Sequence, residues 1–240
     1  MTDTAPRPAA LRVEYRCDPL DALLADPRLL AVFGFGDAAA AIHADPRYLH
    51  VALQAHGDAP FECWFVAGDV QCGRDAGIAW SADGLLQFGA LEIDEQGDIE
   101  SAAAAAYARL QAWLARGDYP HPLRIWNYMD AITEGEGDDE RYRRFCVGRA
   151  RGIGRELAPG ELPAATAIGH PRRSSRFQLY WLAAMPGNTP HTQLAGYDRW
   201  VAKANNASFA AQAAYDELVP AFEALFEREG RDCQSDRKRL

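Results

Sequence analysis

Short apolar segments separated by glycine and Asp-Gly turns dominate the chain from residue 48 to residue 93, and they leave little choice of secondary structure. Runs of a few apolar residues bounded by such turns are typical of β-strands. The dipeptide Asp83-Gly84 lies between two of these runs and is a hairpin signal. We therefore predict an antiparallel meander built from residues 48–54, 63–66, 77–80 and 85–93.

The pattern then changes to a helical period. Apolar side chains recur at steps of three and four residues from Ile99 to Trp113, acidic residues stand at the N-terminal end, and Gly117 follows. This pattern predicts an amphipathic helix over residues 98–116. A second helix is predicted at residues 140–157, and further strands at residues 123–128, 164–168 and 177–185.

This order of elements predicts an α+β fold, in which one mixed sheet carries both helices on the same face. The order is similar to that of the RidA (YjgF-like) fold. We expect residues 1–45 to form an N-terminal extension with strands and residues 46–187 to form the main domain. Residues 188–240 are predicted to be a linker followed by a C-terminal amphipathic helix.

Composition excludes several classes of protein. The chain carries 34 acidic and 25 basic residues, a net charge of −9 that would repel a phosphate backbone, so nucleic acid is not an expected partner. No apolar run approaches the roughly 20 residues that span a bilayer, and residues 1–10 hold no apolar signal core. We expect a cytoplasmic protein with no membrane segment.

Neither a metal nor a disulfide framework is expected. The five cysteines are scattered and form no C-x-x-C pair, so we expect reduced thiols. The six histidines are dispersed, and the common phosphate-binding, dinucleotide-binding, serine-hydrolase and zinc-protease motifs are missing. An anionic small molecule remains an acceptable ligand, because a local arginine pocket decides that affinity.

The second predicted helix carries an arginine in an unusual position. At about 100° per residue, Tyr142, Cys146, Arg149 and Ile153 fall within an arc of about 60°, which predicts Arg149 in the middle of the apolar face. A buried guanidinium needs a carboxylate or phosphate partner. Three readings stay open: a ligand carboxylate, an internal pair with Asp or Glu, or a long side chain that carries its guanidinium past the edge of the core to solvent. The opposite face carries predicted surface charges, namely Arg144, Arg151 and Arg155.

A second candidate lies on the strand that follows the first helix. Arg124, Trp126 and Tyr128 alternate with apolar neighbours and therefore share one face. That face would suit a pocket for a ring-shaped acid, or it is an ordinary exposed sheet face. Tyr142 either adds a phenolic hydrogen bond to a ligand or belongs to the core.

Several segments resemble the chorismatase family. They are DPRYLHVALQ, GRDAGIAWSADGLLQFGALEI, YPHPLRIWNYMDAIT, ERYRRFCVGRARG, PAATAIG and FQLYWLAA, and they extend over about residues 29–187. The similarity is greatest to the branch that makes 3- and 4-hydroxybenzoate, and it covers only the first half of such a protein. In ERYRRFCVGRARG, the substrate-contacting tyrosine and arginine of the family fall on Tyr142 and Arg149.

The resemblance implies removal of the enolpyruvyl group of chorismate as pyruvate, without a metal or organic cofactor, in a pocket between two RidA-like halves. The segment PHTQLAGY matches the family weakly: it keeps Gln193 and Tyr197 but lacks an arginine. The second half of the family, which supplies the acid credited with proton transfer, has no counterpart here. The nearest acids in the matching half are Asp130, Glu134 and Glu140.

Three hypotheses follow. The first is a chorismatase-type enzyme, either divergent or with its site completed across a homo-oligomer. It has no assigned catalytic residue and binds substrate through Tyr142, Arg149, Tyr197 and Arg124. The second is a non-catalytic relative that binds a small carboxylate or serves as an interaction module. A RidA-type imine deaminase is the least favoured, because residues 163–166 lack the arginine of that family.

Overall fold

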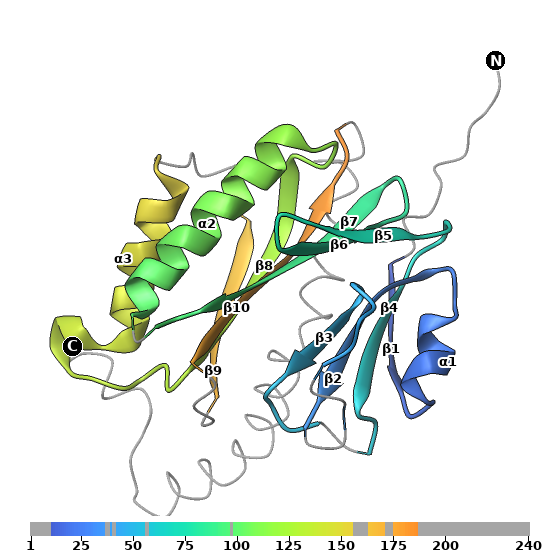
Figure 1. Ribbon diagram of the computed structural model, residues 1–240, viewed down its shortest axis with the longest axis horizontal. Coiled ribbons are helices and arrows are strands. Elements are labelled where there is room, and N and C mark those ends of the chain that lie inside the picture. Colours follow the sequence, from blue (N-terminus) through green and yellow to red (C-terminus); the bar gives the residue numbers. More distant parts are fainter. Residues whose placement is uncertain are drawn as a thin grey trace, which may run out of the picture. The chain divides into compact units, whose positions relative to one another are not determined.

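The computed structural model describes residues 11–36, 39, 42–55, 58–96, 98–155, 163–170 and 175–186. The chain divides into two compact units, residues 1–191 and 192–240, and every described residue belongs to the first unit. Figure 1 shows the strands and helices of that unit. The predicted linker and C-terminal helix, residues 188–240, lie outside the described residues.

The N-terminal strands form a four-stranded sheet. Its elements are β1 (Arg12–Arg16), the short helix α1 (Leu20–Leu24), β2 (Leu29–Phe35), β3 (Tyr48–Val51) and β4 (Phe61–Phe65). The spatial order is β1-β4-β2-β3, in which β2 and β3 are parallel and the other neighbours antiparallel. The predicted boundary between residues 45 and 46 falls between β2 and β3, so this sheet continues across it.

A six-stranded mixed sheet carries the rest of the strands. They are β5 (Gln71–Asp75), β6 (Ile78–Ala82), β7 (Leu86–Asp94), β8 (His121–Asp130), β9 (Ala164–His170) and β10 (Arg176–Ala184). Their order is β5-β6-β7-β10-β8-β9, and only the β8–β9 pair of this sheet is parallel. Asp83 stabilises the predicted β6–β7 hairpin by accepting hydrogen bonds from the backbone N–H groups of Leu85 and Leu86.

The predicted meander is wrong in part. Residues 48–54 and 63–66 supply β3 and β4 of the four-stranded sheet, whereas the six-stranded sheet begins at β5. The sequence of β5, QCGRD, has no apolar alternation because this edge strand is largely exposed. Strand propensity identified the other segments, but it does not say which sheet a strand joins.

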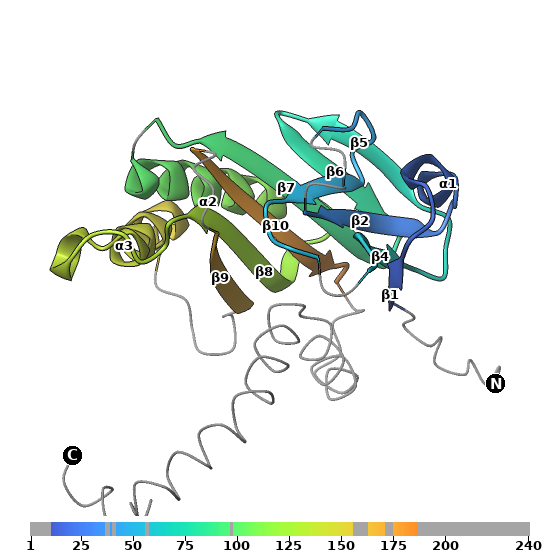
Figure 2. The same ribbon diagram turned by 90° about the horizontal axis from the view of Figure 1, so that it is seen from below.

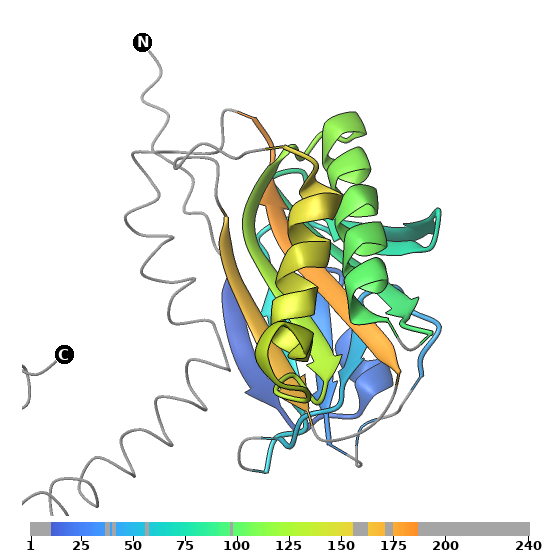
Figure 3. The same ribbon diagram turned by 90° about the vertical axis from the view of Figure 1, so that its left-hand side faces the viewer.

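Two helices cover one face of the six-stranded sheet, as predicted (Figure 3). Helix α2 spans Ile99–Arg116, with Asp98 accepting hydrogen bonds from the N–H groups of Glu100 and Ser101 and with Gly117 at the C-terminal end. After the short 3-10 turn η1 (Gly137–Asp139), helix α3 spans Arg141–Ile153. It ends at Gly154 in the left-handed conformation, with φ 68°, before the predicted end at residue 157.

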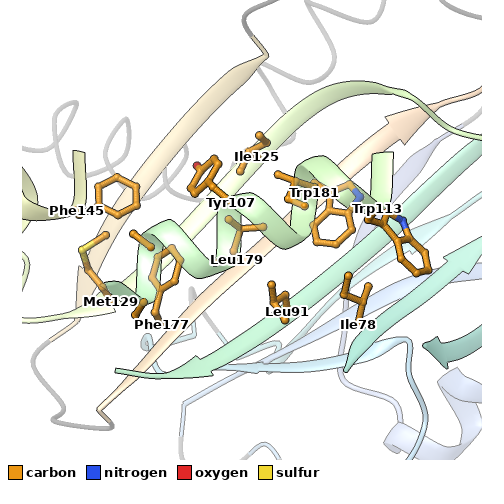
Figure 4. Packing of buried hydrophobic residues seen from close by; sticks show 14 of the residues in the cluster. Ile78, Leu91, Tyr107, Trp113, Ile125, Met129, Phe145, Phe177, Leu179 and Trp181 are labelled. Atoms are coloured by element: carbon orange, nitrogen blue, oxygen red, sulfur yellow. The ribbon is translucent and has the colours of Figure 1, made fainter. Parts of the chain in front are cut away.

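A hydrophobic core fills the space between these helices and the sheet (Figure 4). Side chains at alternate positions of β10, Phe177, Leu179 and Trp181, point into it together with Leu110 and Tyr107 from α2. Each of these five residues is at most 1% exposed. This core fixes which face of each strand the helices cover.

The other face of the six-stranded sheet packs on the four-stranded sheet through aromatic rings, on the side away from α2 and α3 (Figure 2). Tyr180 stacks on Trp126 and Tyr128 with ring centroids 5.4 and 5.1 Å apart, and it also meets Phe33 of β2 at 5.2 Å. We call this set of rings, with Trp64 and Phe88, the aromatic layer.

One carboxyl group lies beside the aromatic layer. Glu62 is 2% exposed and accepts a hydrogen bond from Trp64 Nε1 at 2.8 Å. Burial raises the pKa of Glu62 to about 7, even though hydrogen bonds from Trp64 and Tyr15 favour the ionised form. The sequence pattern had not indicated a buried acid here.

Two further features concern membrane insertion and the cysteines. Within the described ranges, no helix combines the length and apolar character needed to cross a bilayer. Cys17, Cys63, Cys72 and Cys146 are free thiols, and Cys233 lies outside those ranges.

Candidate functional site

Helix α3 carries five arginines, and four of them pair with carboxylates. These contacts attach the helix to the end of β7, to the turn before α3 and to the start of α2. A paired guanidinium is an ordinary structural feature of a surface helix. The pairs are Arg141 with Glu95, Arg143 with Asp138 and Glu140, Arg144 with Asp98 and Glu100, and Arg151 with Glu100.

Arg149 is the exception. It is half-buried, and no carboxylate of the described residues pairs with it. Its Nε atom is buried without a hydrogen-bond partner among those residues, and its Cζ atom lies 5.6 Å from the centre of the Tyr107 ring. An unmet buried donor costs about 1–3 kcal/mol. A ligand carboxylate would remove that cost and suits the planar fork of a guanidinium.

Two glycines decide where Arg149 lies. A Cβ atom at Gly148 would overlap the backbone carbonyl of Glu100, and one at Gly152 would overlap that of Ala104. The face of α3 toward α2 is therefore centred on these glycines and on Phe145, which is 1% exposed. Arg149 lies beside this face.

The predicted centre of the helix face is accordingly wrong by roughly 90°, about one residue's rotation. The prediction from helical periodicity counted only apolar side chains. Because glycine has no side chain, the prediction missed the close contact of Gly148 and Gly152 with α2. The same shift brings Arg144 and Arg151, predicted as surface charges, to the acidic first turn of α2. They are partly exposed, yet they join the two helices.

The floor beneath Arg149 is a chain of hydrogen bonds. Tyr107 donates its hydroxyl hydrogen to Asn127 Oδ1 at 2.9 Å, and Asn127 Nδ2 donates to the Thr166 carbonyl at 3.0 Å. Burial raises the pKa of Tyr107 to about 12, against the opposing effect of the Arg149 charge. The ring is therefore neutral and held in place under the guanidinium.

Tyr142 lies two helical turns before Arg149 on α3 and is 45% exposed. Its ring stacks on Phe145 with centroids 6.1 Å apart and planes 28° apart. Cys146 raises the pKa of Tyr142 through its charge and a hydrogen bond, while the charge of Arg149 lowers it. Tyr142, Cys146 and Arg149 thus share one neighbourhood, which we call the α3 cluster.

Arg124 lies elsewhere. It leaves β8 on the same face as Trp126, whereas Asn127 belongs to the opposite, helix-covered face. The Arg124 Nη2 atom donates to Thr166 Oγ1 at 3.0 Å, and its Cζ atom lies 5.3 Å from the Trp126 ring centre. Burial lowers the pKa of Arg124. The structure therefore places Arg124 and the α3 cluster on opposite faces of the sheet.

The face that carries Arg124 is neither of the alternatives that the sequence left open. Trp126 is 2% exposed and Tyr128 is fully buried, because the four-stranded sheet covers them. Their alternation on one face was predicted. The partner that covers that face was not, since no pattern in β8 records it.

The nearest acids are engaged in structural contacts. Asp130 lies on the face opposite Asn127, where its carboxylate meets His170 Nε2 at 3.1 Å and accepts a hydrogen bond from the Ser175 N–H at 2.7 Å. Glu140 lies 3.6 Å from Arg143, and Glu134 follows β8 in the loop before α3. Tyr197 lies outside the described residues.

Comparison with protein families identifies the first unit. A family model described as "Chorismatase FkbO/Hyg5-like, N-terminal" matches residues 62–183, about half of the chain. A second model, of an aminopeptidase family, matches residues 182–239. Tyr197 falls in the second match, beyond the end of the first. Nearly all of the second match lies outside the described residues, so no site geometry accompanies it.

Two curated relatives are named chorismatase. The protein from Streptomyces rapamycinicus is 33% identical over 129 residues, which are 53% of this chain and 38% of the relative. The protein from Streptomyces hygroscopicus is 37% identical over 110 residues, which are 45% of this chain and 32% of the relative. The chain thus matches about a third of the length of each of these relatives.

A solved structure gives a similar result. A chorismatase crystal structure superposes with a TM-score of 0.61 at 30% identity, covering 74% of this chain and 54% of that one. A YjgF-family protein from Neisseria meningitidis aligns with 49% of this chain at 18% identity and a TM-score of 0.35. The matched residues include β4 to β10 with both covering helices, and so this protein belongs to the FkbO/Hyg5-like chorismatase family, of which it contains the N-terminal region.

Proposed function

We propose that this protein acts on chorismate as a chorismatase, with the α3 cluster holding a carboxylate of the substrate. The observation that carries the proposal is the state of Arg149, a half-buried arginine whose neighbours on the same helix are all paired. Tyr142 supplies a phenolic hydroxyl on the same helix, two turns before Arg149. The two curated relatives, which are named for this activity, support the assignment.

The chemistry defines what else the site needs. A proton must reach the methylene carbon of the enolpyruvyl group, the ether bond to the ring must break, and the three-carbon fragment leaves as pyruvate. Loss of a ring proton then yields a hydroxybenzoate. The α3 cluster can bind and orient a carboxylate, but its only titratable side chains besides Arg149 are a phenol and a thiol. Asp130 and Glu140 are engaged in structural contacts, so the proposal requires an acid from another subunit or another segment.

Pyruvate release from chorismate tests this function. The purified chain is incubated with chorismate, and pyruvate is followed through lactate dehydrogenase and loss of NADH absorbance. We expect Arg149→Ala to abolish release and Arg149→Lys to reduce it strongly, because an ammonium cannot bind a carboxylate in a bidentate manner. Arg143→Ala is the matched control, since Arg143 is exposed and its ion pairs among the described residues are with Asp138 and Glu140 in the segment just before α3. Unchanged release by Arg149→Ala would refute the assignment of the site.

A second function rests on the matched length. Because the match covers 38% and 32% of the curated relatives, a protein that binds a small carboxylate without turnover is the alternative. Calorimetric titration with chorismate separates the two functions. Heat of binding that Arg149→Ala removes, without pyruvate release, favours the binding protein. Absence of both binding and release excludes both functions.

A further inference from the structure

A cavity of about 530 Å³ lies at the C-terminal end of helix α2, where the helix meets strands β5, β6 and β7. Trp113, at the end of the core (Figure 4), lines it from α2, and Tyr119 lines it from the segment after the helix. The sheet contributes Trp80 and Ala82 of β6 and Gln87 of β7. The volume falls within the usual range for ligand pockets, about 300–1,000 Å³.

The register of the sheet explains the floor and one wall of this cavity. Gln71, Ala82 and Gln87 are neighbours in one row across β5, β6 and β7. Ala82 lies in the middle of the row, so only a methyl group separates two long amides. Trp80 lies two positions before Ala82 on the same face of β6, and its ring covers Gly73 of β5, where a Cβ atom would come within 3.1 Å of the indole.

One buried amide faces the cavity with a donor to spare. Gln87 is 6% exposed, and its Oε1 atom accepts a hydrogen bond from Trp113 Nε1 at 2.7 Å. Because an indole nitrogen only donates, this bond fixes the amide oxygen on that side and directs Nε2 the other way. Nε2 meets no acceptor among the described residues. A ligand in the cavity would therefore need an acceptor, such as a hydroxyl oxygen, for this group.

The charge of the lining is negative. Four aspartates line the cavity together with no arginine, lysine or histidine of the described residues. Asp75 pairs with Arg116 at 2.7 Å, whereas the other three, Asp69, Asp83 and Asp118, make no ion pair in the described part of the chain. The C-terminal end of α2 adds the negative end of a helix dipole. The cavity therefore attracts a cation and repels an anion.

The lining favours an organic cation over a metal ion. No cluster of three or more His, Cys, Asp or Glu side chains in the described ranges could hold a metal. Arg116 already places a guanidinium against Trp113, with its Cζ atom 5.0 Å from the ring centre, as expected for an organic cation on an indole. Burial raises the pKa of Tyr119, and the charges of Asp83 and Asp118 add to this effect. Two carboxylates therefore act on one neutral aromatic side chain of the cavity.

We propose that this cavity binds a hydroxylated organic ammonium ion of the amino sugar class. The ammonium group lies among the three unpaired aspartates, a ring hydroxyl accepts a hydrogen bond from Gln87 Nε2, and the sugar ring packs against Trp80. A neutral sugar would leave the aspartates without a counter-charge, and a simple ammonium ion would leave Gln87 unpaired. No residue of the α3 cluster lines the cavity, so this site is separate from the proposed chorismate site and does not depend on it.

Calorimetric titration with glucosamine at about pH 6, where its amine is protonated, tests the proposal. Two comparison probes vary the charge of the same ring: glucose is neutral, and glucuronate is an anion. Glucosamine is expected to bind roughly tenfold more tightly than glucose, because only glucosamine brings a cation to the aspartates and the indoles. Glucuronate is expected not to bind.

Two variants alter the cavity in different ways. Asp69→Asn combined with Asp118→Asn removes two exposed charges and should weaken glucosamine binding roughly tenfold. Ala82→Leu fills the floor without changing the charge and should weaken glucosamine binding to a similar extent. Asp58→Asn combined with Asp138→Asn makes the same change in net charge at exposed positions outside the cavity. This matched control should bind glucosamine as the parent does.

Each outcome either supports or overturns the proposal. Preferential binding of glucosamine that both cavity variants weaken supports it. No glucosamine binding by the parent overturns it, and so does binding of glucose or glucuronate as tight as that of glucosamine. Equal binding by the parent and the variant of Asp69 and Asp118 also overturns it. Both aspartates are exposed, so this variant should fold, as circular dichroism checks, and it keeps the test valid even if Ala82→Leu does not fold.

Discussion

Arg149 and Arg141 differ in a way that stability measurements can detect. Arg141 lies 2.5 Å from Glu95, whose side chain is only 3% exposed, and it also donates to the Asp130 carbonyl. Arg149 has an unmet Nε atom. The two arginines therefore contribute to stability with opposite sign. Arg141 stabilises the fold by neutralising a buried acid, whereas Arg149 destabilises it because its Nε donor is buried without a partner.

We expect Arg149→Met to leave the midpoint of urea unfolding unchanged or raised, because the substitution removes an unsatisfied buried donor and retains packing over Tyr107. Arg141→Met should destabilise the protein by about 3–5 kcal/mol, because Glu95 would stay buried without its partner. Equilibrium urea unfolding of both variants, followed by circular dichroism, makes the comparison. A large loss of stability in Arg149→Met would indicate that Arg149 is structural.

Glu62 makes stability depend on pH. Its pKa is raised from about 4.5 to about 7 in the folded protein, so between these values the folded state holds a proton that the unfolded state has released. The contribution of this group to stability is therefore present at low pH and falls as pH rises, by about 3 kcal/mol in total. Above pH 7 the folded protein carries a buried carboxylate beside aromatic rings.

Glu62→Gln should abolish this dependence while keeping an acceptor for Trp64. The stability of the variant relative to the parent, measured as the difference in their free energies of unfolding, is expected to be greater at pH 8 than at pH 5. Urea unfolding at the two pH values measures it, and all other titrating groups cancel in the comparison. The same difference at both values would contradict the raised pKa.

Residue-level prediction from the sequence succeeded only in part. The chemistry of a semi-buried arginine was visible in the spacing of α3, but its surroundings were not. Tyr107 belongs to another helix. Glu62 is buried where the six-stranded sheet packs on β4, and the sequence of β4 does not indicate that contact. A pattern along one element records which side is apolar and says nothing of which element will cover it.

At the level of elements, the contact between α2 and α3 is unusually close. Gly148 and Gly152 present bare backbone to the carbonyls of Glu100 and Ala104. Arg144 and Arg151 then reach across the contact to the acidic first turn of α2. The contact is therefore sharply sensitive to side-chain size.

Gly148→Ala should destabilise the fold by about 1–3 kcal/mol, because the added methyl group overpacks the contact. Helix propensity alone would make alanine more stable than glycine by up to about 1 kcal/mol. The sign of the measured change therefore shows whether overpacking or helix propensity dominates. Val147→Ala, at an exposed position of the same helix, is the control and should change stability little. Thermal unfolding of both variants gives the answer. A rise in Tm for Gly148→Ala would mean that the helices do not pack this closely.

Sequence patterns located the elements better than their partners. Both helices, the β6–β7 hairpin and the three later strands were predicted from periodicity and turn chemistry, with ends shifted by a few residues. β5 escaped because an exposed edge strand need not alternate. The division of the strands between two sheets was not predicted. β4 is buried on both faces, so its sequence does not show which sheet it joins.

At the scale of the whole first unit, the aromatic layer joins the two sheets. Phe33 contacts Trp64 within its own sheet, and Phe88 and Tyr180 across the layer. Each sheet also has a hydrophobic cluster of its own, the six-stranded sheet with α2 and α3 and the four-stranded sheet with α1, and the aromatic layer couples the two. The two sheets should therefore unfold together.

Hydrogen exchange in increasing urea, read by mass spectrometry, tests this coupling. Peptides from β2 and β4 are expected to lose protection at the same urea concentration as peptides from β7 and β10. Phe33→Ala should lower that concentration equally for all four strands, because its ring belongs to both sheets. Earlier loss of protection in β2 and β4 alone would show that the N-terminal sheet is an independent unit.

The two bare positions of α3 have an evolutionary consequence. Arg149 keeps its place because the helix can neither rotate nor slide against α2 while Gly148 and Gly152 remain. A substitution at either glycine would move Arg149 away from Tyr107 without changing any side chain of the α3 cluster. Inheritance of this site therefore depends on two residues that contribute no chemistry, and relatives that lose them should lose the arginine soon afterwards.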